Sequence, residues 1–263
     1  MINRCLALYY EFRGAKAEKL NFGDLFELDC QLALKLSANP IVLDLLESLM
    51  GPFVQLDGLT LANLPPAREG AYPEVLGWHR DPWGQVPRSN VFERPLAVNA
   101  LYYLQDLTPD VGPLRTLPAS PHLPLTLAPA LHKVRLPGEF LLYPKAGDIV
   151  LHHNNLIHSG TPPTNPTRNR NFVSIFYNLS WLRQSVRFDG PEARALILGF
   201  RANNNYRLLR LMGIDDHISE RSDTGFLAPD GDAWTKWIRA DKQVRKTQKS
   251  STLVSTRKRN ADG

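Results

Sequence analysis

The spacing of apolar residues along the chain changes character near residue 53. Before that point, FGDLFELDCQLALKLSANP places apolar residues at helical spacing after a cap at Asp24, and it predicts a helix that stops at Asn39-Pro40. A second helix is predicted over IVLDLLESLMG and ends at Gly51, a typical residue just beyond a helix C-terminus. We expect both helices to pack against the core and to carry no chemistry.

From 53 to about 180 the pattern becomes one of short strands separated by proline and glycine. The predicted strands lie within FVQLDGLTLAN, EVLGWHRD, LAVNALYYLQ, GPLRTLPAS, GEFLLYPKAGDIVLHH, LIHSG and RNFVSIFYNLSW. Regularly spaced short strands with turn signals predict a β-sandwich or barrel. From 191 onward, PEARALILGF, NNYRLLRLMG and DAWTKWIRA predict further helices. The fold class predicted is therefore mainly β with flanking helices.

The composition fits an ordinary globular protein. Of 263 residues, 43% are hydrophobic and 22% are charged, and there is no apolar run long enough to span a bilayer. The apolar run near the start is followed by Glu11 without a small-residue cleavage site, which argues against a signal peptide. Cys5 and Cys30 have no zinc-site spacing. We expect a soluble, cytoplasmic protein with no membrane partner, its oligomeric state left open.

The positive charge of the chain is concentrated at its C-terminal end. Residues 239–263 carry eight Lys and Arg against two Asp, a net +6, so that residues 1–238 hold −1 of the total of +5. We interpret 241–263 as a basic, disordered tail, with an anionic partner as the alternative, and expect no nucleic-acid partner. The rest, 1–240, is expected to be one domain, with a core over about 53–180 and helical flanks over 20–50 and 191–240.

The first candidate for chemistry is GWHRDPWG, residues 77–84. On a strand, side chains two apart project to the same face, so His79 and Asp81 could bind one ion together. Two His and one carboxylate form the ligand set of ferrous oxygenases, which leaves metal positions open for oxygen chemistry. A metal site of this kind would need a third ligand besides His79 and Asp81.

Candidates for that ligand lie in GDIVLHHNNLIHSG, which offers His152, His153 and His158. A strand over 148–153, a turn at Asn154-Asn155 and a return through 156–159 would place His158 inward. His152 and His153 would then lie on opposite faces, so at most one of them could point the same way. We favour His158, with His153 as the alternative.

A long loop rich in Pro and Gly follows the His-x-Asp pair, over 82–96. Loops of this length inside compact domains are often functional, so this one is a candidate substrate lid.

Four stretches, in order, resemble the phytanoyl-CoA dioxygenase-like (PhyH) family of iron(II)- and 2-oxoglutarate-dependent oxygenases. They are WHRD, GPLRTLPASPH, KAGDIVLHHNNLIHSG and RNRNFVSIFYN, and the similarity spans roughly 40–180. The chain differs from the family pattern at Ser159-Gly160, near Leu101 and at PASPH. The resemblance implies a distorted double-stranded β-helix, a jelly-roll fold of the cupin type, with helices packed outside.

The resemblance also implies roles for single residues. His79, Asp81 and His158 would bind Fe(II), and an arginine would bind the distal carboxylate of the cosubstrate 2-oxoglutarate. Aligning the following strand favours Arg170 for that role over Arg168, and Ser174 shares the strand face of Arg170. Asn99 is a further candidate to reach the cosubstrate, the alternative being a cross-strand or cap hydrogen bond.

The expected activity is that of a dioxygenase that hydroxylates a small molecule with O2 and releases succinate and CO2. Relatives that halogenate lack the carboxylate ligand, so Asp81 indicates hydroxylation. Aromatic walls and cationic side chains are expected around the substrate, and the candidates are Trp78, Trp83, Arg88, Phe92 and Arg115. The alternatives are a jelly-roll binding protein without turnover, and an oxygenase that acts on a macromolecule.

Overall fold

The computed structural model describes residues 1–12, 25–51, 53–66, 74–87, 94–214 and 239. The chain divides into two compact units, Met1–Ala193 and Arg194–Gly263. The predicted basic tail, the centre of the predicted lid (88–93) and most of the predicted helix DAWTKWIRA lie outside the described residues. No helix in the described part of the chain is long and apolar enough to cross a membrane.

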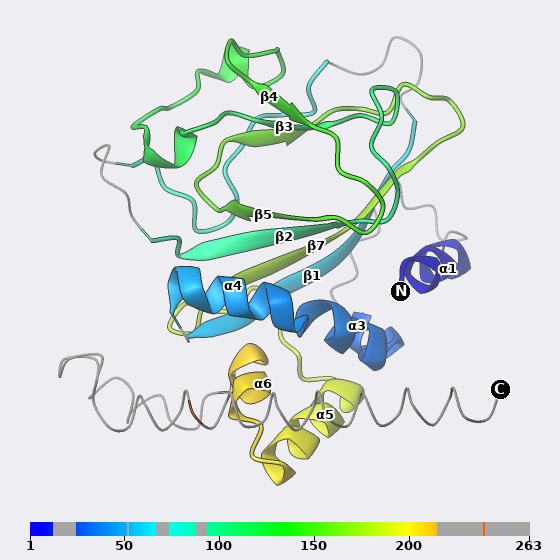
Figure 1. Cartoon of the computed structure of the whole chain (residues 1–263), viewed down its shortest axis with the longest axis vertical. Coiled ribbons are helices and arrows are strands. Elements are labelled where there is room, and N and C mark those ends of the chain that lie inside the picture. Colours follow the sequence, from blue (N-terminus) through cyan, green and yellow to red (C-terminus); the bar gives the residue numbers. More distant parts are fainter. Residues whose placement is uncertain (13–24, 52, 67–73, 88–93, 215–238, 240–263) are drawn as a thin grey trace. The chain divides into compact units, whose positions relative to one another are not determined.

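The first unit is built on two antiparallel sheets that face each other (Figure 1). The larger sheet has the strand order β1-β7-β2-β5, and the smaller has the order β4-β3-β6. Their bounds are Val54–Leu64 (β1), Ala97–Tyr103 (β2), Leu114–Thr116 (β3), Phe140–Leu142 (β4), Ile149–His153 (β5), His158–Gly160 (β6) and Arg170–Leu179 (β7). This arrangement confirms the predicted fold class, mainly β with flanking helices, and fits a jelly roll.

Two helices of the first unit lie against the outer face of the larger sheet. The bounds of the helices are Ile2–Phe12 (α1), Leu25–Leu28 (α2), Cys30–Ser37 (α3), Pro40–Met50 (α4), Pro191–Ala202 (α5) and Tyr206–Leu211 (α6), with short 3-10 turns at Ser120–His122 and Pro129–Leu131. In Figure 1, α3 and α4 lie along β1 and its neighbours. The two tyrosines Tyr102 and Tyr177 donate their hydroxyl protons to carbonyls of Leu36 and Ser37, each at 2.9 Å. These carbonyls end α3 and lack helical partners, so the tyrosines fasten the helix to the sheet.

The N-terminal helices differ in one respect from the prediction. The expected single helix is interrupted at Asp29, whose carboxylate accepts a hydrogen bond from the backbone N–H of Leu32 (3.1 Å) and so caps α3. The first helix ends before Asn39-Pro40 as expected, with α3 ending at Ser37, and Pro40 is the first residue of α4. Gly51 ends α4 as expected, at φ 86°.

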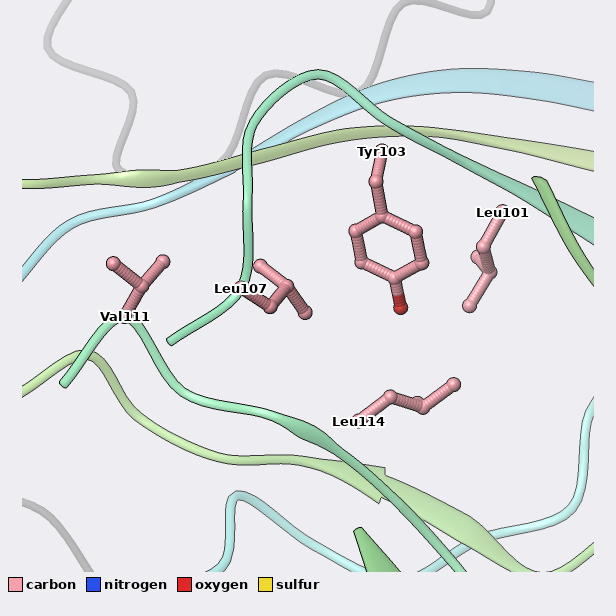
Figure 2. Close-up of a cluster of buried hydrophobic side chains, with 5 residues drawn as sticks. All are labelled: Leu101, Tyr103, Leu107, Val111 and Leu114. Atoms are coloured by element: carbon pink, nitrogen blue, oxygen red, sulfur yellow. The ribbon is translucent and has the colours of Figure 1, made fainter. Parts of the chain in front are cut away.

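Side chains of the larger sheet alternate between the helices and the interior. Tyr102 and Tyr177 point outward to α3, so their neighbours Leu101 and Tyr103 point inward, between the sheets. The interior cluster joins the two sheets through Leu101 and Tyr103 of β2 and Leu114 of β3, with Leu107 and Val111 from the connecting loop (Figure 2). The register pairs Asn99 with His152 and Leu101 with Ser174, which places these polar residues on the same interior face.

Two predicted strand features differ in the structure. The segment 74–81 is not a strand, and it pairs only through an isolated bridge between His79 and His158. The strands β5 and β6 do not form a hairpin, because β5 pairs with β2 whereas β6 pairs with β3. Residues 154–157 therefore pass from one sheet to the other, and His158 begins a strand that faces His152 across the interior.

Candidate metal centre

Three side chains converge at one end of the sheet interior: His79, Asp81 and His158. Each offers one ligand atom, and the three atoms lie within 4.8 Å of one another. Oδ1 of Asp81 lies 4.0 Å from Nε2 of His79 and 3.7 Å from Nε2 of His158. One carboxylate oxygen and two imidazole nitrogens that face a common point are a ligand set for a divalent transition metal.

Backbone pairing brings these residues together. His79 and His158 each donate their backbone N–H to the other's carbonyl, at 3.0 Å in both directions. Residues opposite one another in an antiparallel pair project to the same side, which puts the two imidazoles adjacent, with ring centroids 4.4 Å apart. The backbone N–H of Asp81 donates to Asn154 O at 3.0 Å and fixes the third residue on the same frame. This single β-bridge therefore holds His79 next to His158, although residues 74–81 form no strand.

Both histidines are oriented by their backbone. Nδ1 of His79 lies 2.8 Å from Gly77 O, and Nδ1 of His158 lies 3.0 Å from Leu156 O. A carbonyl only accepts, so Nδ1 carries a proton in each ring, which leaves Nε2 as the nitrogen that can bind a metal. This partner on the far nitrogen is the usual support of a metal-binding histidine.

The two oxygens of the Asp81 carboxylate have different partners. Oδ1 faces the imidazoles, whereas Oδ2 accepts a hydrogen bond from the Asn99 amide at 3.2 Å. Ser174 donates its hydroxyl proton to Oδ1 of Asn99 at 2.9 Å. Asn99 and Ser174, both predicted near the cosubstrate, thus form a chain of hydrogen bonds that ends on Asp81.

Burial sets the protonation of the cluster. It holds the pKa of His158 well below the usual value, with the neighbouring histidines adding to the effect. It also lowers the pKa of His152 and raises that of the Asp81 carboxyl, against the opposing influence of His152. Neutral imidazoles can coordinate a metal, and a bound divalent cation would offset the desolvation of the Asp81 carboxylate.

The structure separates the two adjacent histidines of β5. His152 points inward, with its ring centroid 4.4 Å from that of His158 and its Nδ1 3.6 Å from Oδ2 of Asp81. His153 points the other way, where its Nδ1 accepts a hydrogen bond from the backbone N–H of Asn155 at 2.9 Å. The sequence carried the signal for an inward His152 in the alternation of β5, but the sequence alone does not give its register with Asn99.

The two candidate arginines lie in different surroundings. Arg170 begins β7 and is 2% exposed; its Nη1 forms a long hydrogen bond of 3.5 Å to Thr161 O, and its Nε has no hydrogen-bond partner among the described residues. A side chain at Gly160 would approach Nη1 of Arg170 to 3.0 Å, so glycine there leaves room for the guanidinium. Arg168 is half-buried in the turn before β7.

Comparison with known proteins identifies the family. The family model for phytanoyl-CoA dioxygenase (PhyH) matches residues 15–171, more than half of the chain. The chain belongs to the PhyH family. Comparison with curated protein sequences gives no match.

Solved structures agree on the fold of this PhyH-family chain. HygX from Streptomyces hygroscopicus, with nickel and 2-oxoglutarate bound, has a TM-score of 0.54 at 13% identity, over 69% of this chain and 80% of that chain. The apo form of the non-heme monooxygenase ThoJ has a TM-score of 0.50 at 19% identity, over 80% of this chain and 88% of that chain. Both the resemblance stated from the four sequence stretches and the predicted jelly-roll fold are confirmed.

The predicted substrate-binding residues of this PhyH-family chain are spread over different environments. Trp78 is 1% exposed, packs with Val75 and Leu136, and donates its Nε1–H to Val134 O at 2.9 Å. Arg115 forms an ion pair with Glu139 at 2.6 Å and a hydrogen bond to Thr161 at 2.9 Å. Arg88 and Phe92 lie outside the described residues.

Among the predicted substrate residues that the structure describes, Trp83 is the most exposed. It is 38% exposed and has φ 62°, in the left-handed region, within a turn closed by the hydrogen bond from Gly84 N to Asp81 O at 2.9 Å. A side chain at Gly84 would lie 2.6 Å from that carbonyl, so the turn requires glycine. The same short turn therefore sets both the metal-ligand candidate Asp81 and the exposed indole.

Replacing Asn99 with alanine is expected to lower the affinity of the site for a divalent metal about 10- to 100-fold, because outer partners hold ligands in place. The measurement is calorimetric titration with Co(II). Asn63→Ala is the matched control, since the Asn63 amide donates to Asn171 and not to a ligand. Equal cobalt affinity in wild type and Asn99→Ala would contradict the supporting role of Asn99.

Proposed function

We propose that this PhyH-family protein is an Fe(II)- and 2-oxoglutarate-dependent dioxygenase that hydroxylates a small molecule and releases succinate and CO2. The observation that carries the proposal is the convergence of Nε2 of His79, Nε2 of His158 and Oδ1 of Asp81. Both imidazoles are oriented by backbone carbonyls, burial lowers the pKa of His158, and the buried carboxylate of Asp81 is held by Asn99. These features fit a ferrous ion with three protein ligands.

In this proposal Arg170 binds the distal carboxylate of 2-oxoglutarate. The guanidinium lies against Gly160, two residues along β6 from His158. At the rise of a strand, that is about 7 Å from the metal ligand, close to the length of 2-oxoglutarate. A buried guanidinium without an anion is costly, so this position favours a carboxylate ligand. The bound 2-oxoglutarate in the structurally similar HygX is consistent with this proposal.

When bound, iron(II) and the 2-oxo acid supply the activation of O2, coupled to decarboxylation of the cosubstrate. The side chains of this protein bind and orient: His79, Asp81 and His158 fix the metal, and Arg170 fixes the 2-oxo acid. Asp81 would supply a carboxylate ligand to the metal, and relatives that halogenate lack this ligand, which favours hydroxylation here. Trp83 is the residue we propose for contact with the substrate, since its indole is exposed next to the ligand turn.

The test is anaerobic reconstitution of the full chain with Fe(II) and 2-oxoglutarate. We expect the visible charge-transfer band of the iron chelate in wild type and its loss in His79→Ala, because that substitution removes one of three ligands. A band of equal intensity in His79→Ala would disprove the ligand assignment. Succinate release on admission of O2, with a panel of small molecules, then identifies the substrate class. A wild-type protein that binds neither iron nor 2-oxoglutarate would overturn the proposed function.

A further inference from the structure

Tyr103 has a buried hydroxyl for which the described residues offer no hydrogen bond of good geometry. Its side chain is 1% exposed and comes from the end of β2, on the interior face of the larger sheet. Figure 2 shows the hydroxyl pointing into the space framed by Leu101, Leu107 and Leu114. Apolar side chains cannot accept the phenol proton, and an unpaired buried donor costs stability.

The neighbour of this hydroxyl is the guanidinium of Arg170. The central carbon of the Arg170 guanidinium lies 6.0 Å from the centroid of the Tyr103 ring. Burial raises the pKa of the Tyr103 phenol and Arg170 opposes this rise, so the phenol keeps its proton at neutral pH. A protonated phenol can give a proton to an acceptor, but a guanidinium has no lone pair to receive it. Nε of Arg170 is itself without a partner in the described part of the chain.

The Tyr103 hydroxyl of β2 and Nε of Arg170 on β7 are thus two buried donors without a hydrogen-bond partner, on neighbouring side chains. Tyr103 stands opposite Phe172 in the register of β2 and β7, and Arg170 is two residues from Phe172 on the same face. On the other side, Leu114 of β3 stands opposite Gly160 of β6, whose missing side chain leaves room for the guanidinium. A single group that accepts several hydrogen bonds and carries negative charge would satisfy both donors.

We propose that the hydroxyl of Tyr103 is a second donor to the distal carboxylate of the 2-oxo acid, beside Arg170, and so is a positioning residue for the cosubstrate. This inference rests on the proposed function. The phenol binds one carboxylate oxygen, while the guanidinium binds through Nε and an Nη. The pair selects a dicarboxylic 2-oxo acid over one without the far carboxylate, because the latter would leave both donors buried and unpaired.

The experiment compares Tyr103→Phe with wild type by anaerobic calorimetric titration of the Fe(II)-loaded full chain with 2-oxoglutarate. We expect the Kd for 2-oxoglutarate to rise about 10- to 100-fold, the usual effect of removing a hydrogen bond to a charged group. The Kd for Fe(II) is expected to stay the same, because the phenol is not part of the metal cluster. The melting temperature without 2-oxoglutarate is expected not to fall, since the lost hydroxyl has no partner there.

Tyr102→Phe is the matched control, one residue away on the opposite face of β2. Its hydroxyl donates to Leu36 O, so its loss is expected to lower the melting temperature and to leave the Kd for 2-oxoglutarate unchanged. The proposal fails if Tyr103→Phe binds 2-oxoglutarate as wild type does, or if both variants weaken binding equally, which would indicate a packing effect. Wild type that does not bind 2-oxoglutarate at all would instead remove the proposed function on which the inference rests.

Discussion

His158→Ala is expected to abolish the charge-transfer band of the iron and 2-oxoglutarate chelate and to raise the Kd for Fe(II) more than about 100-fold. Loss of an outer partner of a ligand alone costs 10- to 100-fold in metal affinity, and His158 is proposed to be a ligand itself. Its Nε2 faces Asp81 Oδ1 at 3.7 Å, and its Nδ1 is occupied by Leu156 O. The measurement is an anaerobic titration with Fe(II), followed by the visible spectrum with 2-oxoglutarate.

His153→Ala is the control for His158→Ala. His153 is the other histidine that the sequence left open, but its Nδ1 accepts from the backbone of Asn155 on the side away from the cluster. We expect this variant to keep the band and the iron affinity of wild type. If the band is lost in His153→Ala and kept in His158→Ala, His153 and not His158 is the metal ligand.

The fold was predictable because its strands carry their own signals. Alternating residues and breaks at Pro and Gly place β1, β2, β5 and β7 close to their observed positions. The segment 74–81 was wrongly predicted to be a strand because EVLGWHRD has strand composition, whereas only His79 in this segment forms a β-bridge. Pairing is a tertiary property, and local composition does not determine it.

Some residues of the candidate site could be predicted from the sequence, and others could not. His79 and Asp81 are two residues apart and His158 follows a readable turn, so local spacing brings all three into view. Tyr103 was missed because LYYLQ reads as an apolar strand, and nothing local distinguishes Tyr102, which fastens a helix, from Tyr103, which faces Arg170. Only the register of β2 against β7 tells the two tyrosines apart.

The two oxygens of Asp81 have different partners, and this explains why polar side chains are needed in the interior beside the metal ligands. With Oδ1 toward the imidazoles and Oδ2 bound by Asn99, the carboxylate has a fixed rotation. Ser174 in turn fixes Asn99 through its amide oxygen. The interior face of β2 and β7 thus changes along its length, from the polar support of the metal ligands to the guanidinium of Arg170. We infer that a bound 2-oxo acid lies along this face.

Arg170→Met is expected to raise the Kd for 2-oxoglutarate about 30-fold or more, because losing one partner of a buried charged pair costs about 2–5 kcal/mol. The same change is expected not to lower the free energy of unfolding without 2-oxoglutarate. Arg170 is 2% exposed, and the described residues provide no carboxylate for it. An apolar side chain of similar length removes a buried charge whose desolvation is not repaid in the free protein. Calorimetric titration and urea unfolding measure the two quantities.

Arg168→Met is the control, since Arg168 lies in the turn before β7, where its charge acts on Asp106 and Asp110. We expect this variant to bind 2-oxoglutarate as wild type does. Weak binding in Arg168→Met together with normal binding in Arg170→Met would assign the carboxylate to Arg168. If Arg170→Met lowers both the free energy of unfolding and the affinity for 2-oxoglutarate, the guanidinium stabilises the fold. If the affinity falls while the free energy of unfolding does not, Arg170 serves to bind the ligand.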